Sequence, residues 1–471
     1  METNYQVPTP SEYVSLMLNY AGYQDHLYGK RILENSCGEG NILVEIVKRY
    51  IQSAIKERID SDEIIRGLEC DVIAFETDLD CIIKCKKRLN NISEQYGLRN
   101  IMWNIKQQDY LMYKHTEYDF IIGNPPYITY HNLNEKQRNY LRRHFESCKK
   151  GRFDYCYAFI EKCLKEMNEN AKLVYLVPYS VVRNKFSLML RNMILPQLEE
   201  LYDYKGIQIF PNRVTSSVIL VCGNIKNKKD VLYHNMYKGT KHYLPKTLFG
   251  DSWIFDKGKK GSFRFGDYFK VSNSVATLCN DVFLFEKYGI RDDLYILKDG
   301  KVEETLVYDA ISTKSKKRMK KTGKLPKIIF PYKVVNQKVK HINEVEFKKN
   351  FPNAYQYLLK KREQLGKRKV SETVHWYEYG RSQAISDIFS SPKLIMPMIL
   401  THDVHVYMAN KNAIPYAGYY VKALNDMTLA VAKKILESKE FYEYVTHCGT
   451  PTTPTSYRVS VKDICNYYFD L

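Results

Sequence analysis

The first 225 residues alternate between short apolar runs and amphipathic stretches, and this alternation restricts the fold more than any other feature. Apolar runs that predict strands occur at 31–34, 72–75, 101–105, 118–122, 172–177 and 216–221. The spacing of apolar residues between these runs predicts helices at 42–55, 80–90, 154–167 and 187–195. Strands that alternate with helices indicate βαβ units, and hence an α/β fold with a mostly parallel sheet.

The pattern changes in the second half of the chain. A polar segment follows Asn224, and the alternation stops beyond about Gly261. Two basic runs then occur at 314–327 and 360–369, with aromatic residues among and after them. The first run is either a nucleic-acid contact or a solvated loop. We therefore predict a catalytic domain, a connecting segment and a basic mixed α/β domain, at 1–225, 226–260 and 261–471.

The charge of the chain indicates its class of partner. An excess of 72 Lys and Arg over 53 Asp and Glu gives a formal charge of +19, so a polyanion is the first partner to consider: nucleic acid, or an anionic membrane surface. No apolar run approaches the ~18–20 residues that span a bilayer, and residues 1–10 lack a secretory signal pattern. The 11 cysteines indicate reduced thiols in a cytoplasmic protein. Cys81 and Cys85 lack a second pair and a nearby His, so we predict no metal site.

The strongest chemical signal is an Asn-Pro-Pro-Tyr sequence, directly after an apolar run. Open α/β sheets bind ligands at the carboxyl ends of their strands. Because Pro125 and Pro126 lack N–H groups, the side-chain oxygen of Asn124 and the Pro125 carbonyl are left as acceptors. Two acceptors suit an –NH₂ group, and Tyr127 offers a flat ring beside them. The motif predicts a binding site for an amino group on a planar ring. The alternative, without a function, is a tight turn with a packed tyrosine.

Polar residues also follow the first three predicted strands. The loop at 34–40 contains two glycines, which let a ligand approach the backbone at a helix N-terminus. They are too few for a dinucleotide fingerprint. Glu76 stands where doubly wound folds place an acid on ribose hydroxyls, and Asp109 with Tyr110 could bind and stack an adenine. Each alone reads equally well as a strand-end cap, but their succession favours one binding site.

In this order the motifs resemble the gamma-class, TaqI-like N6-adenine DNA methyltransferases of restriction–modification systems. The resemblance covers roughly 5–225 and is looser from Phe263 onward. It implies a Rossmann-like, S-adenosylmethionine-dependent methyltransferase domain with a seven-stranded mixed sheet, followed by a target-recognition domain. It implies cofactor binding by Thr9, Glu34, Ser36, Gly38, Gly40, Glu76, Asp109 and Tyr110. It implies catalytic roles for Asn124, Pro125, Pro126, Tyr127 and Phe210.

Within these assignments, two details are specific to this chain. The first loop departs from the family pattern at Asn35-Ser36-Cys37, so Ser36 would offer mainly its backbone to the cofactor. Phe210 lies in the segment 209–215, and by resemblance it stacks the target adenine opposite Tyr127. In the second domain, the resemblance is carried by 266–268 and 376–378, and Arg381 and the loop 451–457 are candidate DNA contacts.

The resemblance implies transfer of a methyl group from S-adenosylmethionine to N6 of an adenine flipped out of duplex DNA, with no metal and no general base. Double-stranded DNA is then the expected partner, with a separate cognate restriction endonuclease in the cell and no membrane. Three alternatives stay open: adenine methylation in RNA, methylation of protein glutamine by the same loop, and a DNA-binding protein with an inactive fold.

Overall fold

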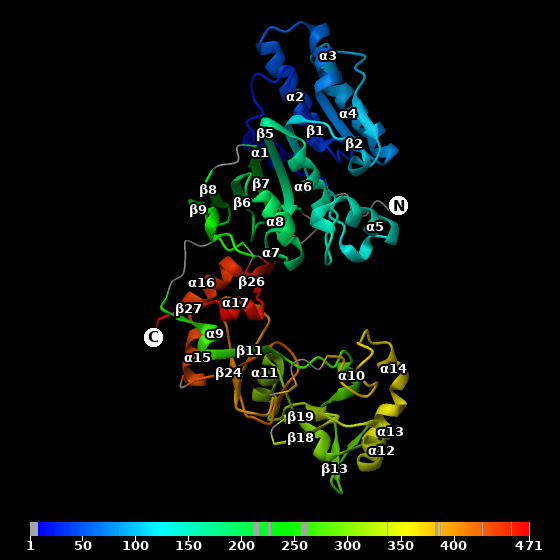
Figure 1. Ribbon diagram of the computed structural model, residues 1–471, viewed down its shortest axis with the longest axis vertical. Helices are drawn as coiled ribbons and strands as arrows, with labels where there is room; N and C mark the ends of the chain where they lie inside the picture. Colours follow the sequence, from blue (N-terminus) through cyan, green and yellow to red (C-terminus); the bar gives the residue numbers. More distant parts are fainter. Residues whose placement is uncertain are drawn as a thin grey trace. The chain divides into compact units, whose positions relative to one another are not determined.

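The computed structural model divides into two compact units (Figure 1). We call Met1–Gly258 with Thr450–Pro454 the N-terminal unit, and Lys259–Gly449 with Thr455–Leu471 the C-terminal unit. The structure describes residues 8–210, 216–224, 228–251, 253–255, 261–336, 338–381, 385–386, 388–425, 427–453 and 455–470, without the side chains of 320–322. Among these residues, no helix has the length and apolar character needed to cross a bilayer.

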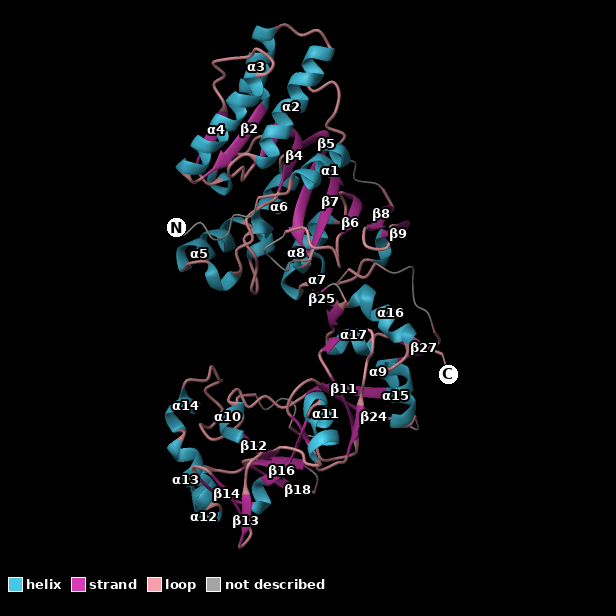
Figure 2. Cartoon of the chain, turned by 180° about the vertical axis from the view of Figure 1, so that it is seen from behind, coloured by secondary structure: helices cyan, strands magenta, loops and turns pink. Residues whose placement is uncertain are grey.

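A nine-stranded sheet, counted over the described residues, forms the centre of the N-terminal unit (Figure 2). Its strand order is β3-β2-β1-β4-β5-β7-β6-β8-β9. The strands are β1 (Ile32–Glu34), β2 (Val72–Glu76), β3 (Asn104–Gln107), β4 (Tyr118–Gly123), β5 (Met167–Pro178), β6 (Leu198–Asp203), β7 (Ser217–Gly223), β8 (Asp230–Asn235) and β9 (Thr240–Pro245). Strands β1 to β5 are parallel, and β7 runs antiparallel between β5 and β6.

The expected count of seven strands is too low. The first seven positions of the strand order make up a mixed sheet of the expected kind, and β8 and β9 extend it at the β6 edge. Both come from the segment 226–260, which the sequence analysis reads as a connection. Only alternate residues, Val231, Tyr233 and Leu244, enter the core, and the opposite faces mix polar residues with Leu232 and the exposed Tyr243. Short strands of this composition lack the continuous apolar run that marks the central strands.

Two cores cover the two faces of the sheet, because successive side chains on a strand point in opposite directions. Ile32 packs in one core and its neighbour Leu33 in the other. The Ile32 core includes α1 (Ser11–Ala21), α2 (Asn41–Lys56), α3 (Ser61–Asp71) and α4 (Leu79–Glu94). The Leu33 core includes α5 (Glu135–His144), α6 (Cys156–Lys165), α7 (Ser180–Arg183) and α8 (Leu188–Ile194). This arrangement places helices on both faces of the sheet. The apolar periodicity predicted α2, α4, α6 and α8, but it did not reveal α1, α3, α5 and α7 or the strand β6.

The C-terminal unit is a mixed α/β structure built from small sheets. Its strands are β10 (Phe263–Arg264), β11 (Phe269–Asn273), β12 (Leu284–Phe285), β13 (Gly289–Arg291), β14 (Leu294–Leu297), β15 (Gly300–Glu303), β16 (Val307–Ile311), β17 (Lys327–Ile329), β18 (Tyr332–Val335), β19 (Lys338–His341), β20 (Lys393–Met396), β21 (Ile399–Leu400), β22 (Tyr407–Ala409), β23 (Ile414–Pro415), β24 (Tyr419–Ala423), β26 (Ser456–Arg458) and β27 (Tyr468–Phe469). Its helices are α9 (Phe265–Tyr268), α10 (Asn280–Phe283), α11 (Thr313–Thr322), α12 (Glu344–Asn350), α13 (Pro352–Lys360), α14 (Arg362–Gly366), α15 (Leu429–Leu436), α16 (Lys439–Cys448) and α17 (Val461–Cys465). Separate apolar clusters around Phe330 and Phe441 form its cores.

The two basic runs have different structures. Most of the first forms helix α11, whose N-terminus is closed by a capping box between Ser312 and Ser315. A capped helix is thus present where a loop was one of the two interpretations. In the second run, Arg368 donates to the backbone carbonyls of Thr277, Glu378 and Trp376, at 2.9, 2.8 and 2.7 Å. That arginine holds loops of the unit together.

Candidate active site

The loop after β1 is a tight turn that starts helix α2. The Cys37 N–H donates to the Phe75 carbonyl (2.9 Å), and the Gly40 N–H donates to the Cys37 carbonyl (2.8 Å). Gly40 has φ +83°, and a Cβ there would lie 2.5 Å from the Sγ atom of Cys85. Gly38 is also left-handed, with φ +52°, but no atom lies within 4 Å of the position of its Cβ. The loop therefore packs against α4 at Gly40 and has open space at Gly38.

Glu76, at the end of β2, ties its strand to this loop. Its Oε2 accepts a hydrogen bond from the Gly38 N–H at 2.9 Å. Its Oε1 accepts from the N–H groups of Thr77 (2.7 Å) and Asp78 (2.9 Å). Because β1 and β2 are parallel neighbours, their carboxyl ends meet at one edge of the sheet. The structure thus places an anionic side chain beside the glycine loop, in the position that the sequence analysis reads as a ribose acid.

Two buried acceptors lie where β1 enters the loop. Glu34 is only 2% exposed, and burial raises its pKa well above the ordinary value of 4.5. Among the described residues, Glu34 Oε2 and Asn35 Oδ1 have no hydrogen-bond partner. The Asn35 amide nitrogen, in contrast, donates to the Tyr175 hydroxyl and to Cys163 Sγ. Buried acceptor atoms without donors suit a ligand that carries N–H groups.

Asp109 and Tyr110 follow β3, and the structure turns them into the protein. The Asp109 carboxylate accepts from the Leu111 N–H (2.9 Å) and the Tyr155 hydroxyl (2.7 Å). Tyr110 is 1% exposed, and its hydroxyl donates to Glu166 Oε2 at 2.5 Å. Its ring packs among core aromatic rings and under the Lys162 ammonium. In the structure Tyr110 is therefore not available for stacking on a ligand, because its ring is packed in the core and its hydroxyl is hydrogen-bonded there.

Asn124 follows β4 and joins three chain segments. Its amide nitrogen donates to Thr9 Oγ1 at 3.2 Å, and its backbone carbonyl accepts from the Ser36 hydroxyl at 3.3 Å. In the structure the amide nitrogen faces Thr9, so Oδ1 is the opposite, acceptor end of the amide. Ser36 acts here through its side chain, whereas the sequence analysis expects mainly its backbone to take part. Thr9, Ser36 and Asn124 lie together, although they are up to 115 residues apart.

The rest of the Asn-Pro-Pro-Tyr loop is rigidly held. Pro125 is buried and Pro126 is half-buried. The Tyr127 hydroxyl donates to the Leu176 carbonyl at 2.7 Å, and its ring packs against the core that contains Leu33. Burial raises the pKa of Tyr127 well above its ordinary value, so the hydroxyl stays protonated.

Phe210 does not face Tyr127 in this structure. It is 2% exposed and packs in the core that contains Ile32, on the other face of the sheet. The expected pairing of the two rings around a base is therefore absent from the described structure, because the apolar ring of Phe210 is covered by its own core. The following part of the predicted segment, 211–215, lies outside the described residues.

Several supporting residues escaped the sequence analysis. Tyr155, Glu166 and Tyr175 bind predicted site residues through side-chain hydrogen bonds, yet each lies within a predicted core helix or strand with no local signal of this role. In the C-terminal unit, Tyr377 and Glu378 are buried, and Arg381 is exposed. The segment 451–457, expected to be a loop, lies mostly in two strands, β25 (Thr450–Thr453) and β26; Tyr457 is buried and Pro454 lies outside the described residues.

Comparison with known proteins agrees with this arrangement of motifs. Residues 29–210 match the Eco57I restriction-modification methylase family. The expected resemblance to restriction–modification DNA methyltransferases is thereby confirmed, and the narrower gamma class stays a prediction.

Curated relatives resemble part of the chain. The type II restriction enzyme and methyltransferase RM.Eco57I of Escherichia coli is 23% identical over 60% of this chain and 32% of its own length. The modification methylase CviBIII of Paramecium bursaria Chlorella virus NC1A is 29% identical over 37% and 38%, and the type II methyltransferase M.BstVI of Geobacillus stearothermophilus is 25% identical over 45% and 41%. The chain thus spans about a third to two-fifths of the length of these relatives.

A solved structure resembles the fold. The type IIL restriction-modification enzyme MmeI, in complex with DNA, aligns with a TM-score of 0.60 over 98% of this chain and 66% of that chain, at 12% identity. At this identity the likeness concerns the fold alone, and it agrees with the mixed α/β architecture.

Proposed function

We propose that this chain is a site-specific DNA methyltransferase that modifies N6 of adenine with S-adenosylmethionine as methyl donor. The observation that carries the proposal is Asn124 at the end of β4, with its amide oriented by Thr9 and its carbonyl held by Ser36. The named activities of the matched relatives support methylation as the reaction. In this proposal the N-terminal unit performs the chemistry and the C-terminal unit recognises double-stranded DNA.

The residues after β1 and β2 fit the proposed cofactor. Gly38 leaves open space at the loop, and Glu34 and Asn35 provide buried acceptor atoms for a ligand that carries N–H groups. Glu76 lies at the same edge and would receive ribose hydroxyls. When bound, S-adenosylmethionine supplies a sulfonium methyl group that needs no further activation.

The chemistry required of the protein is mainly positioning. The lone pair of adenine N6 is conjugated into the ring, so N6 is a weak nucleophile. Hydrogen bonds from its two hydrogens to Asn124 Oδ1 and the Pro125 carbonyl would draw N6 toward tetrahedral geometry and localise the lone pair. The two prolines keep both acceptors in one place. N6 is then held in a fixed orientation toward the methyl group, so the reaction does not depend on a random encounter. The extra proton on N6 can leave after the transfer.

Extrusion of the adenine from the duplex costs a few kcal/mol, and stacking on aromatic rings, at ~1–3 kcal/mol per base, offsets part of it. Tyr127 is placed beside Asn124 by the chain itself. Phe210 would contribute a second face only after it leaves its core contacts. We therefore assign the primary stacking role to Tyr127.

The test is the variant Asn124→Ala, with Asn91→Ala on the exposed surface of α4 as matched control. Transfer of labelled methyl groups to duplex DNA should fall by ~10²-fold or more, by analogy with loss of one preorganised active-site hydrogen-bonding group. Calorimetry should show cofactor affinity within a few-fold of wild type. Digestion of the product and mass spectrometry should identify N6-methyladenine. RNA and a glutamine peptide, offered in parallel, separate the alternative substrates, and full activity of Asn124→Ala would contradict the mechanism.

A further inference from the structure

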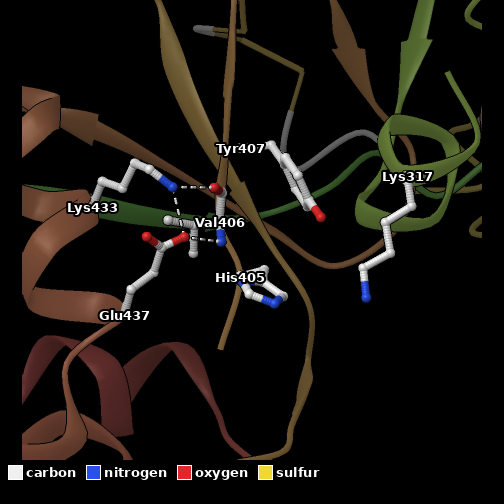
Figure 3. Close-up of a pocket in the computed structure, with 6 residues that line it drawn as sticks. All are labelled: Lys317, His405, Val406, Tyr407, Lys433 and Glu437. Carbon is white, nitrogen blue, oxygen red and sulfur yellow. Dashed lines mark hydrogen bonds and ion pairs between the residues drawn. The ribbon is translucent and has the colours of Figure 1, made fainter. Parts of the chain in front are cut away.

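A pocket of about 380 Å³ lies within the C-terminal unit (Figure 3). All the residues that line it belong to this unit, and none belongs to the candidate active site. Three chain segments line it: helix α11, the approach to strand β22, and the end of helix α15. The lining residues are Lys317, His405, Val406, Tyr407, Lys433 and Glu437. Two of these side chains, Lys433 and Glu437, hold the backbone of Val406 in place. Three others, Lys317, His405 and Tyr407, form a binding surface.

The support is a clamp on the backbone of Val406. The Glu437 carboxylate accepts from the Val406 N–H at 2.9 Å, and the Lys433 ammonium donates to the Val406 carbonyl at 2.9 Å. Lys433 also donates to Glu437 at 2.6 Å, as the dashed lines of Figure 3 show. Val406 itself is 1% exposed and packs in the core around Phe441. Both backbone polar groups of Val406 and its side chain are therefore held by the protein.

The binding surface consists of His405 and Tyr407, on either side of the clamped Val406, and of Lys317 on helix α11. Burial alternates along the segment, with His405 exposed, Val406 buried and Tyr407 half-buried, as on a strand with one face on a core. Figure 3 shows the His405 ring, the Tyr407 hydroxyl and the Lys317 ammonium around the same space. Within the described part of the chain, these three side chains have no hydrogen-bond or ion-pair partner. The adjacent Arg318, in contrast, forms an ion pair with Glu286 at 2.6 Å.

The three polar ends are all able to donate. A Lys ammonium, a Tyr hydroxyl and an imidazole N–H together suit a ligand edge with several acceptors. In duplex DNA, guanine presents such an edge in the major groove through its N7 and O6 atoms, and Lys or Arg is its common partner. Strand β22 lies at the edge of the sheet β11-β24-β20-β22, so no further strand of that sheet covers it.

We infer that Lys317, His405 and Tyr407 form a base-reading contact for a guanine of the DNA target. This inference rests on the proposed function, because it assigns to the C-terminal unit one position of the recognised sequence. The clamp explains why base reading is favoured over phosphate contact: a specific contact needs its donors on a fixed backbone, whereas a phosphate contact tolerates a mobile lysine. Lys433 and Glu437 are positioning residues in this scheme.

The experiment compares Lys317→Ala, His405→Ala and Tyr407→Phe with Lys314→Ala, a change of an exposed lysine on the same helix outside the pocket. Full-length proteins bind a random duplex library, and the bound sequences are read out together with the methylated ones. The pocket variants should lose preference for guanine at one position by ~10-fold to 100-fold, while the other positions keep theirs. Lys314→Ala should leave the preference for every base unchanged.

Two results would overturn the inference. One is an equal loss of DNA affinity for all sequences, with the slope of the salt dependence reduced by about one phosphate contact. This result would indicate a contact to the DNA phosphate backbone. The other is an unchanged sequence preference in the three pocket variants. Failure of the proposed function looks different: wild-type protein would select particular duplexes without methylating adenine, and the binding selection would still report on the pocket.

Discussion

At the scale of single residues, the candidate site depends on hydroxyl groups that fix the orientation of their neighbours. Thr9 binds the amide nitrogen of Asn124, Ser36 binds its carbonyl, and the Tyr127 hydroxyl binds the Leu176 carbonyl. An amide that can rotate by half a turn exchanges its donor and its acceptor. The hydrogen bond to Thr9 restrains this rotation, and for this reason Thr9 is a positioning residue for the proposed reaction.

The variant Thr9→Val tests that role, because it keeps the shape of the side chain and removes the hydroxyl. We expect kcat for methyl transfer to fall by about 10-fold, equivalent to ~1.4 kcal/mol, the net value of a typical hydrogen bond. Thr9→Ser keeps the hydroxyl and should retain most of the activity. The measurement is single-turnover transfer to duplex DNA, and equal rates for valine and wild type would remove Thr9 from the mechanism.

Glu34 predicts a pH dependence of stability. Because burial raises its pKa in the folded protein, the folded state holds the proton more tightly than the unfolded state. The wild type is therefore penalised as pH rises from the unfolded value of 4.5 toward the raised folded value, and below 4.5 the penalty is absent. Denaturant unfolding should show Glu34→Gln gaining stability relative to wild type as pH increases through this window. A pH-independent difference between the two proteins would show that Glu34 has an ordinary pKa.

At the scale of elements, the two glycines of the β1–α2 loop have separable roles. Gly40 is left-handed and touches α4, whereas Gly38 is left-handed and faces open space. Gly40→Ala should destabilise the protein by roughly 1–3 kcal/mol, through an unfavourable φ and a clash with Cys85. Gly38→Ala should cost less stability, about 1 kcal/mol, and should weaken cofactor binding more. Thermal unfolding and calorimetry with S-adenosylmethionine measure the two effects, and the reverse order of stability loss would contradict this division.

The elements also show what sequence patterns can and cannot predict. Periodicity located β1 to β5, β7 and the helices α2, α4, α6 and α8, because each has an apolar run or stripe. It missed β6, whose apolar residues are interrupted by Glu199 and Glu200. The positions of Asn124, Glu76 and the glycine loop at one sheet edge follow from parallel strand order. The burial of Tyr110 and Phe210 does not, since it depends on Glu166 and on the packing of distant segments. Strands β8 and β9 escaped for a related reason: both carry few apolar residues, with β9 at the edge of the sheet and β8 beside it.

At the scale of the whole molecule, the charge of +19 takes on a more specific meaning. Helix α11 holds several of the basic residues on a capped, exposed helix, while Arg368 and Lys393 use their donors on backbone carbonyls of their own unit. Only part of the positive charge is thus offered to a partner. The formal charge alone therefore does not give the number of phosphates that this protein neutralises.

The salt dependence of DNA binding measures that number. Each neutralised phosphate contributes about −0.9 to the slope of log Kobs against log salt concentration. We expect a slope of roughly −5 for a duplex without the recognition sequence, which corresponds to five or six contacts. Anionic lipid vesicles of equal charge concentration serve as the control polyanion, and binding to them should be weaker at every salt concentration. A slope near −1, or tighter binding to vesicles than to duplex DNA, would contradict a role for the exposed basic surface in holding DNA.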